Sequence, residues 1–193
     1  MMKAPKIELN APVTIGFTVI AFISLIFGYA TLGESTKALF TCYSTSADDP
    51  MQYVRLVTYI FGHRDMTHFV GNFTTLTLLG PMLEEKYGSK ALTVMIFVTA
   101  LVGGGANVML SSGAIVGASG IVYMFIILSA CTSVSASDGK IPVSLVLVFV
   151  LYIGKEVVNG LTVADGVSHS THILGGICGA VFGLLYRKVP AKS

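Results

Sequence analysis

Two long stretches without a charged residue constrain this chain more than any other feature. Neither Leu9–Gly33 nor Ala91–Ser137 contains Asp, Glu, Lys or Arg. A helix of about 20 apolar residues crosses the ~30 Å hydrocarbon core of a bilayer, so the first stretch is long enough for one span and the second for two. Charged residues make up 11% of the chain, against roughly a quarter in soluble domains. We therefore predict a membrane protein, whose first stretch is too long for an ordinary signal peptide and is retained as a span.

Polar segments divide the apolar sequence into six predicted membrane spans. These are Leu9–Gly33, Met66–Leu83, Ala91–Leu110, Gly117–Val134, Ile141–Gly154 and Gly166–Tyr186. The fifth is short, and it can extend further because the side chain of Lys155 can reach the membrane surface. Residues 34–65 predict an extramembrane loop with a short amphipathic part. Because the sequence has no internal repeat and no low-complexity linker, we predict that residues 1–193 form a single all-α domain, a six-helix membrane bundle.

Lys and Arg residues in the short loops predict the orientation of the bundle. Six spans put both termini on one side, where eight basic residues fall, against four on the other side. The eight are Lys3, Lys6, Lys86, Lys90, Lys140, Arg187, Lys188 and Lys192, and the four are Lys37, Arg55, Arg64 and Lys155. The excess predicts cytoplasmic termini, with loops 34–65, 111–116 and 155–165 outside. The short loops favour a prokaryotic plasma membrane, and no basic stripe suggests binding to nucleic acid.

Four polar side chains near the outer ends of the predicted spans are candidates for function, because polar groups inside a bilayer are costly. They are His68, Asn72, Ser119 and His172. The predicted topology brings all four to a similar depth in the membrane, although depth alone does not establish contact.

Ser119 lies in Gly117-Ala118-Ser119-Gly120, where a loop enters the fourth predicted span. A serine hydroxyl needs a nearby base to act as a nucleophile, and a helix N-terminus offers free N–H groups and favours developing negative charge. The flanking glycines allow a sharp turn and the close approach of another chain. Tyr123, four residues later, shares the face of Ser119 and could pack its ring on a base. The alternative is a serine among the small residues that pack membrane helices.

His172 is the candidate base. Together with Gly175 and Gly179, at spacings of three and seven residues, it lies on one face of a helix. The two glycines would let this face approach the fourth span closely and bring the imidazole to Ser119. Two alternatives stay open at this point: His172 is an ordinary histidine at the membrane interface, or His169 is the base.

His68 and Asn72 are four residues apart and therefore share one face of the second predicted span. Both side chains can donate hydrogen bonds. With the backbone N–H of Ser119 they could bind the oxyanion of a tetrahedral intermediate. A structural polar pair that joins two helices is an equal alternative.

Metal and aspartate chemistry are not predicted. His63 and His68 are five residues apart, rather than four as in His-Glu-x-x-His, and no glutamate stands beside either. The three cysteines are far apart in sequence and form neither a disulfide framework nor a metal-ligand spacing. Asp65 and Asp165 lie at span boundaries, whereas an aspartate protease needs two carboxylates within the bilayer. We therefore expect no metal and no cofactor.

Together these features resemble the rhomboid family of intramembrane serine proteases over roughly residues 53–186. Four of the family's motifs occur in the family's order: His-x4-His-x3-Asn from His63 to Asn72, Glu-x3-Gly at Glu84 and Gly88, Gly-x-Ser-Gly around Ser119, and His-x2-Gly-x3-Gly at His172, Gly175 and Gly179. Each motif is modestly specific alone, but four in order on six predicted spans are strongly specific.

The resemblance implies a role for each of these residues. Ser119 and His172 would form a catalytic dyad without a third carboxylate, and His68, Asn72 and the Ser119 amide would be the oxyanion donors. Tyr123 would stack on His172. His63 and Glu84 would be structural, with Glu84 tying the cytoplasmic turn, and the outer loop Gly160–Ser168 would cap the site.

The activity implied is cleavage of a peptide bond in or near a transmembrane segment of single-span or multi-span membrane proteins, within the lipid bilayer. One alternative is a catalytically silent rhomboid-like protein that binds membrane helices, although such relatives usually lack the serine or the histidine. A small transporter or channel subunit is the other alternative, but it would carry polar residues through the bilayer midplane, where these spans are almost wholly apolar.

Overall fold

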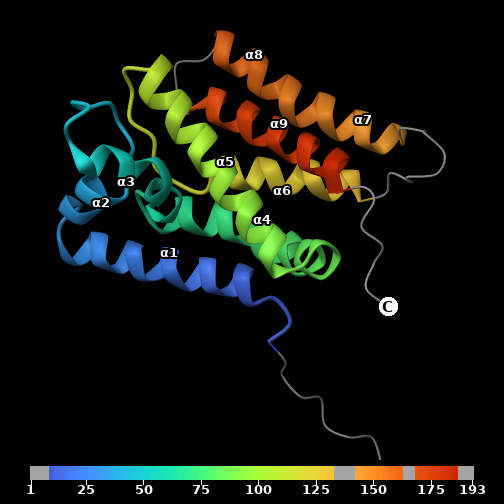
Figure 1. The fold of residues 1–193 in the computed structure, drawn as a ribbon, viewed down its shortest axis with the longest axis horizontal. Helices are drawn as coiled ribbons and strands as arrows, with labels where there is room; N and C mark the ends of the chain where they lie inside the picture. The colour runs from blue at the N-terminus through green and yellow to red at the C-terminus, as the bar shows by residue number, and fades with distance from the viewer. Residues whose placement is uncertain (1–8, 133–141, 163–167, 187–193) are drawn as a thin grey trace, which may run out of the picture.

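The structure is a computed structural model, and it describes residues 9–132, 142–162 and 168–186. Within these ranges the chain is helical, apart from loops and one isolated antiparallel bridge between Cys42 and Ile115. The elements are α1 (Pro12–Ala30), α2 (Glu34–Leu39), α3 (Pro50–Thr58), the 3-10 helix η1 (Tyr59–Phe61), α4 (Met66–Tyr87), α5 (Ser89–Leu110), α6 (Ser119–Cys131), α7 (Val143–Phe149), the π-helix η2 (Val150–Gly154), α8 (Lys155–Thr162) and α9 (His169–Leu185). Figure 1 shows them packed as a bundle, with α2 and α3 together at one end.

A helix lies at the position of each predicted span. Three of these are long and apolar enough to cross a membrane, namely α1, α5 and the continuous helix Val143–Thr162 that comprises α7, η2 and α8. The apolar helices α6 and α9 are shorter, and α4 has 22 residues. The part of the chain that the structure describes is therefore an all-helical fold with several apolar helices.

The fifth predicted span is longer than the sequence indicates. Its expected end at Gly154 is wrong, because the helix continues through Lys155 to Thr162. The prediction of an outer loop from residue 155 is therefore wrong for residues 155–162. The expected cap Gly160–Ser168 begins inside this helix, and residues 163–167 lie outside the described part of the chain. The predicted polar turn at 135–140 and both termini also lie outside the described part of the chain.

Helices α6 and α9 form the most extensive helix pair of the fold. A Cβ atom on Gly175 of α9 would overlap the carbonyl oxygen of Gly120 on α6, and one on Gly179 would lie 2.5 Å from the carbonyl oxygen of Met124. The glycine-lined face of α9 therefore packs directly on the backbone of α6. Figure 1 shows α8 along the opposite side of α9, so α9 lies between the two.

Glu84 joins the first three long helices at the end of the bundle away from α2 and α3. Its buried carboxylate accepts hydrogen bonds from the backbone N–H groups of Val13 (2.9 Å) and Thr14 (3.1 Å), which begin α1. The hydroxyl of Ser89 at the start of α5 donates to it as well, at 2.8 Å. A carboxylate at a helix N-terminus satisfies N–H groups that have no partner within the helix. Glu84 therefore fixes the start of α1 against the α4–α5 turn.

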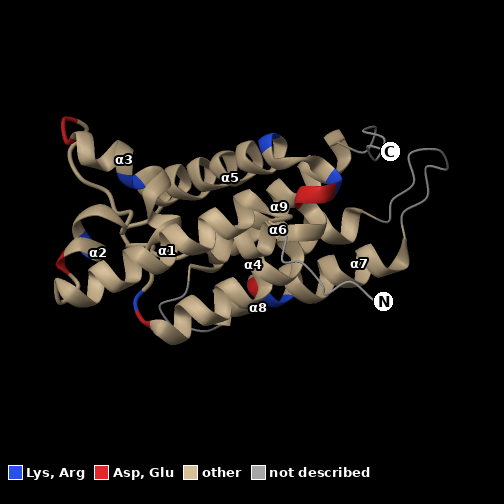
Figure 2. Cartoon of the chain, turned by 90° about the horizontal axis from the view of Figure 1, so that it is seen from below, with Lys and Arg blue, Asp and Glu red and all other residues tan. Residues whose placement is uncertain are grey.

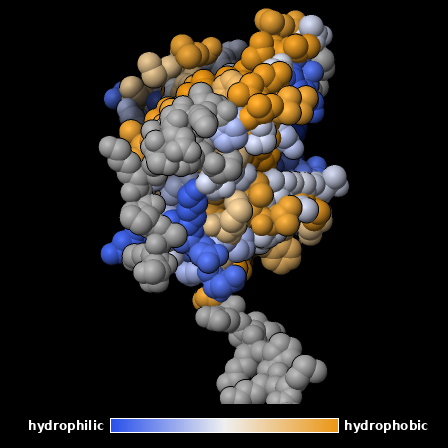
Figure 3. Space-filling model, turned by 90° about the vertical axis from the view of Figure 1, so that its right-hand side faces the viewer, coloured by the Kyte–Doolittle hydropathy of each residue, from blue (hydrophilic) through white to orange (hydrophobic). Residues whose placement is uncertain are grey.

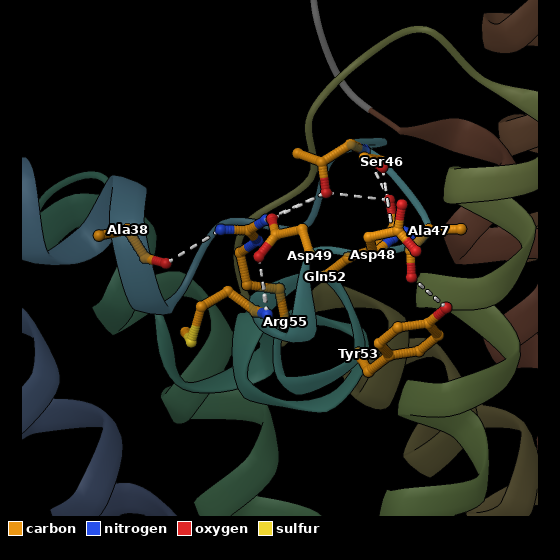
Figure 4. Close-up of polar contacts among 10 residues, drawn as sticks. Ala38, Ser46, Ala47, Asp48, Asp49, Gln52, Tyr53 and Arg55 are labelled. Carbon is orange, nitrogen blue, oxygen red and sulfur yellow. Dashed lines mark hydrogen bonds and ion pairs between the residues drawn. The ribbon is translucent and has the colours of Figure 1, made fainter.

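A polar network orders the segment between α1 and α4. Arg55 of α3, 4% exposed, forms an ion pair with Asp49 (2.8 Å) and lies over the ring of Tyr43. Figure 4 shows this pair, together with the bond from the Arg55 guanidinium to the carbonyl oxygen of Ala38 on α2. Hydrogen bonds from the Thr45 hydroxyl and a backbone N–H, with the nearby guanidinium, hold the pKa of Asp49 below its ordinary value. The network ties α2 to α3 beside the cavity described below.

The outer surface of the bundle is apolar over long stretches. Large hydrophobic side chains are exposed along α1, α5 and the α7–α8 helix, and Figure 3 shows hydrophobic residues over much of one side of the molecule. Figure 2 shows charged residues gathered mainly toward the two ends of the long helices. Lys155 and Glu156, within the α7–α8 helix, are an exception. An apolar belt between charged ends is the surface expected of a protein surrounded by lipid.

Candidate active site

Ser119 and His172 meet where α6 and α9 begin. The Ser119 hydroxyl lies 2.8 Å from Nε2 of His172, a hydrogen-bond distance. The contact follows from the packing of the two helices, because the touching pair Gly120 and Gly175 comes one residue after Ser119 and three after His172. The structure thus brings the predicted nucleophile to the predicted base. His169, the rival base, directs its Nδ1 to Glu156 instead.

The ring of Tyr123 lies flat on the imidazole of His172. The two ring centroids are 4.4 Å apart, and the planes differ by 11°. Tyr123 lies one helical turn after Ser119 on α6, so its ring covers the base from the side of the nucleophile's own helix. The stacking predicted for this tyrosine is therefore present in the structure.

Glu156 is the residue that the sequence analysis missed. Its Oε2 lies 2.8 Å from Nδ1 of His172 and 2.7 Å from Nδ1 of His169, and its Oε1 accepts a hydrogen bond from the Tyr123 hydroxyl. The residue is 3% exposed. The resemblance implies a dyad of Ser119 and His172 without a third carboxylate, and the structure places a carboxylate against the imidazole of that pair.

The error has an identifiable cause in the sequence. Ending the fifth span at Gly154 placed Glu156 in an outer loop, where a carboxylate needs no explanation. The apolar residues Val157, Val158 and Leu161 follow it and continue the helical pattern. Extending the helix through them would have put a carboxylate inside the apolar bundle, where such a group marks a candidate site.

Glu156, His169 and His172 also have the spacing of a metal site. In the described residues their ligand atoms all lie within 4.8 Å of one another. The carboxylate oxygen, however, is 2.7 and 2.8 Å from the two Nδ1 atoms, distances at which charge-assisted N–H···O bonds normally form. Hydrogen bonds therefore account for the cluster without a bridging ion.

His68 and Asn72 lie on the other side of Ser119. A Cβ atom on Gly117 would lie 2.7 Å from Nε2 of His68 and 3.6 Å from Nδ2 of Asn72, so Gly117 leaves room for both side chains. Its φ of 119° is a backbone conformation that side-chain-bearing residues rarely adopt. Glycine is thus required here both for the turn and for the close approach.

His63 holds Asn72 from behind. The Nδ2 of Asn72 donates to Nε2 of His63 at 3.0 Å, and the opposite ring nitrogen, Nδ1, lies 3.3 Å from the carbonyl oxygen of Phe61. A proton on Nδ1 satisfies both contacts, because it leaves Nε2 free to accept. His63 is buried and therefore fixes the direction in which the amide of Asn72 points.

A cavity of about 820 Å³ connects these groups. Among the residues that line it are all the polar candidates, namely His63, His68, Asn72, Ser119 and His172, together with Gly117. Tyr29 of α1, Lys37 of α2 and Arg64, which lies just before α4, line it as well. The site is thus a chamber at the α2–α3 end of an apolar bundle, in which a few polar side chains, among them a hydrogen-bonded serine and histidine, face a lining that is otherwise largely apolar.

Comparison with known proteins shows which family and which curated relative this chain resembles. Residues 50–189 match the family model described as the Rhomboid domain. The rhomboid protease GlpG of Serratia proteamaculans (strain 568) is 29% identical over 112 residues, which cover 58% of this chain and 40% of that relative. The chain therefore spans less than half of the relative's length. Since the family model covers most of its residues and its apolar helices indicate an integral membrane protein, the chain belongs to the rhomboid family.

Proposed function

We propose that this protein is an intramembrane serine endopeptidase that cleaves membrane proteins in or near their transmembrane segments. The observation that carries the proposal is the 2.8 Å contact between the Ser119 hydroxyl and Nε2 of His172, both of which line a cavity of the bundle. Membership of the rhomboid family and the name of the relative, a rhomboid protease, support the same reaction.

The catalytic steps follow from the two atoms in contact. The Ser119 oxygen attacks the carbonyl carbon of the scissile bond while its proton passes to Nε2 of His172. The imidazolium then gives this proton to the leaving amine, and an ester joins Ser119 to the N-terminal part of the substrate. Water, deprotonated by the same nitrogen, hydrolyses the ester and restores the serine.

Negative charge develops on the substrate's carbonyl oxygen and needs preorganised donors. The Asn72 amide has a second N–H beyond the one that bonds His63. His68 shares the cavity with it, and Ser119 is the first residue of α6, where backbone N–H groups have no partner in a preceding turn. Asn72, His68 and the Ser119 N–H are therefore the proposed oxyanion donors.

The substrates are single-span or multi-span membrane proteins. A peptide bond inside a transmembrane helix is hydrogen-bonded and shielded, so the helix must unwind locally before its carbonyl reaches Ser119. Family resemblance leads us to expect small side chains beside the cleaved bond. The proposed chemistry needs only protein side chains and water.

The proposed setting is the plasma membrane of a prokaryote, crossed by six spans, with both termini in the cytoplasm. Lys37, Thr41 and Ala114 line the cavity and belong to loops that the distribution of basic residues assigns to the outside. The active site would therefore open to the outer face, from which hydrolytic water enters.

A catalytically silent rhomboid-like protein is the alternative. The same hydrogen bond argues against it, because a protein that only binds helices has no need of a serine aligned with a buried imidazole.

The first prediction tests the reaction directly. Purified protein is mixed in detergent with a single-span substrate protein that carries small residues near the outer end of its span. Ser119→Ala and His172→Ala should each abolish detectable cleavage, because one removes the nucleophile and the other its base. Ser170→Ala, an exposed serine on α9, is the matched control and should cleave as the wild type does.

A fluorophosphonate probe gives an independent readout of the nucleophile. The wild type should carry one adduct on Ser119, identified by mass spectrometry, and His172→Ala should react far more slowly. Cleavage that persists in Ser119→Ala, or an adduct on a different serine, would show that the assignment is wrong.

A further inference from the structure

A buried carboxylate inside an apolar bundle needs a reason. Glu156 is 3% exposed, and an unpaired charge at such a position destabilises the fold. Three donors offset that effect here: the Tyr123 hydroxyl on one carboxylate oxygen, and the Nδ1 atoms of His169 and His172 on the other. The carboxylate is therefore held in place from α6 and α9 at once.

The bond to His172 determines where that imidazole carries its proton. A carboxylate accepts hydrogen bonds, so Nδ1 of a neutral His172 is protonated and Nε2 keeps its lone pair. Nε2 is the nitrogen that faces the Ser119 hydroxyl at 2.8 Å. Glu156 thus selects the one neutral form of His172 in which the nitrogen beside the nucleophile can accept a proton.

We propose that Glu156 is a positioning residue that completes a Ser119–His172–Glu156 triad. The inference rests on the proposed protease function and adds a third member to its machinery. Glu156 holds the Nδ1-protonated form of His172 and stabilises the imidazolium that forms when the Ser119 proton moves to Nε2. The carboxylate itself stays ionised, as does the acid of serine-protease triads.

Two neighbours keep the carboxylate aligned. Tyr123 contacts both partners, because its ring stacks on His172 while its hydroxyl donates to Oε1 of Glu156. His169, one turn before His172, donates to the same oxygen as His172 does. With the carboxylate fixed on both sides and the ring clamped flat, the imidazole has little freedom to turn away from Ser119.

The simpler explanation is that Glu156 only clamps α8 to α9. Those helices are in close contact without it, because a Cβ atom on Gly160 would lie 3.2 Å from the Cβ of His169. A clamp also needs only one histidine, whereas the carboxylate reaches the very ring that touches Ser119. The geometry therefore favours a role in the reaction.

The decisive variant is Glu156→Gln, which keeps the shape of the side chain and removes its charge. A glutamine can donate to His172 through its amide and so admit the wrong tautomer, and removing the acid of a serine-protease triad lowers kcat by about ten-thousandfold. We expect kcat to fall at least about a hundredfold, with KM within about threefold of wild type, as when an interaction made only in the transition state is lost. Glu156→Asp, which retains the charge, should recover part of the loss.

The pH profile separates positioning from structure. Four titratable side chains lie around His172. They are Glu156 on α8, Tyr123 on α6, His169 on α9 and, across the cavity, His68 on α4. In the part of the chain that the structure describes, Glu156 is the carboxylate bonded to His172, and its charge favours the protonated imidazole. In Glu156→Gln the acidic limb of the kcat/KM profile should therefore move to lower pH. A variant that merely packs poorly would keep the wild-type limb.

Lys155→Gln is the matched control, because it removes the adjacent charge from an exposed position on the same helix; it should leave kcat and the pH profile unchanged. His169→Gln removes the other imidazole from the carboxylate and should cost much less activity than Glu156→Gln. For every variant of the whole chain, the unfolding temperature and the labelling rate of Ser119 by a fluorophosphonate are measured beside the cleavage kinetics.

Wild-type kcat and an unshifted acidic limb in Glu156→Gln would overturn the proposal. Equal losses in His169→Gln and Glu156→Gln, each matched by a lower unfolding temperature, would also overturn it and leave a structural clamp. If Glu156→Gln does not fold, Glu156→Asp decides: a wild-type labelling rate and pH limb despite the displaced carboxylate count against positioning. Ser119→Ala reports separately on the protease function, so the two ideas fail independently.

Discussion

Asn72 shows how single residues of this site depend on one another. Its amide is half of a pair with the buried His63, whose own proton is directed to the carbonyl oxygen of Phe61. This chain of hydrogen bonds uses one N–H of Asn72 and leaves the other for a ligand. Donors held rigidly before the reaction stabilise developing charge better than donors that must reorient.

Removal of this donor should slow the chemical step. Asn72→Ala is expected to lower kcat by about a hundred- to a thousandfold, the usual effect of losing one oxyanion donor, while KM for the substrate changes little. Steady-state kinetics on the single-span substrate provide the measurement. Thr74→Ala, an exposed position on the same helix, is the control and should retain wild-type kcat. A fall of less than about fivefold in Asn72→Ala would leave the amide as a structural partner of His63.

The residues of the site differ in how visible they are in the sequence. His68 and Asn72 are four apart on one helix, and His172 precedes two glycines at helical spacing, so periodicity alone brings them to common faces. Glu156 has no such partner nearby in sequence. Its contacts come from His172, His169 and Tyr123 on two other helices, and only packing in three dimensions brings these together.

At the scale of helices, the contact between α6 and α9 carries the site. The small face of α9 lets its backbone touch that of α6, and this sets the distance between the first turns of the two helices. The glycine spacing made this contact predictable. The length of the fifth helix was harder to predict, because the charged pair Lys155–Glu156 resembles the end of a span. In the structure the helix continues past this pair, since two histidines and a tyrosine form hydrogen bonds with the carboxylate of Glu156.

A methyl group at the contact should therefore damage both stability and activity. In Gly175→Ala the new Cβ would overlap the carbonyl oxygen of Gly120, a backbone atom that cannot rotate away. Overpacking of this kind costs about 1–3 kcal/mol of unfolding free energy, and pushing the helices apart lengthens the Ser119–His172 contact. Thermal unfolding and cleavage rate, measured in the same detergent, should both fall.

The matched control for this prediction is Gly16→Ala on α1, where a Cβ would meet no atom within 4 Å. Alanine in an open helical position is favoured over glycine by about 0.5–1 kcal/mol, so this variant should unfold at the same or a higher temperature. Equal behaviour of the two alanine variants would mean that the α6–α9 contact is looser than the structure shows.

The whole molecule has an apolar belt with charged ends, and its two ends differ. One end holds the Glu84 junction between α1, α4 and α5. The other holds the Asp49–Arg55 network and the cavity, so a substrate of the proposed protease would reach Ser119 from that end or through the side of the bundle. For the proposed protease, the orientation of the chain in the membrane therefore decides whether cleavage products are released outside or inside the cell.

Opposite ends of α5 provide a test of this orientation. Ser111, just after the helix, and Lys90, near its start, are both exposed. Because basic residues gather at the Lys90 end, positive-inside topology puts Ser111 outside. A membrane-impermeant maleimide added to spheroplasts should therefore label Ser111→Cys at once and Lys90→Cys only after permeabilisation. The unsubstituted chain, whose Cys42 and Cys131 are buried and whose Cys178 is half-buried, gives the background. The reverse pattern would place the candidate active site on the cytoplasmic side, and would assign the proposed proteolysis to that face of the membrane without altering the geometry of Ser119 and His172.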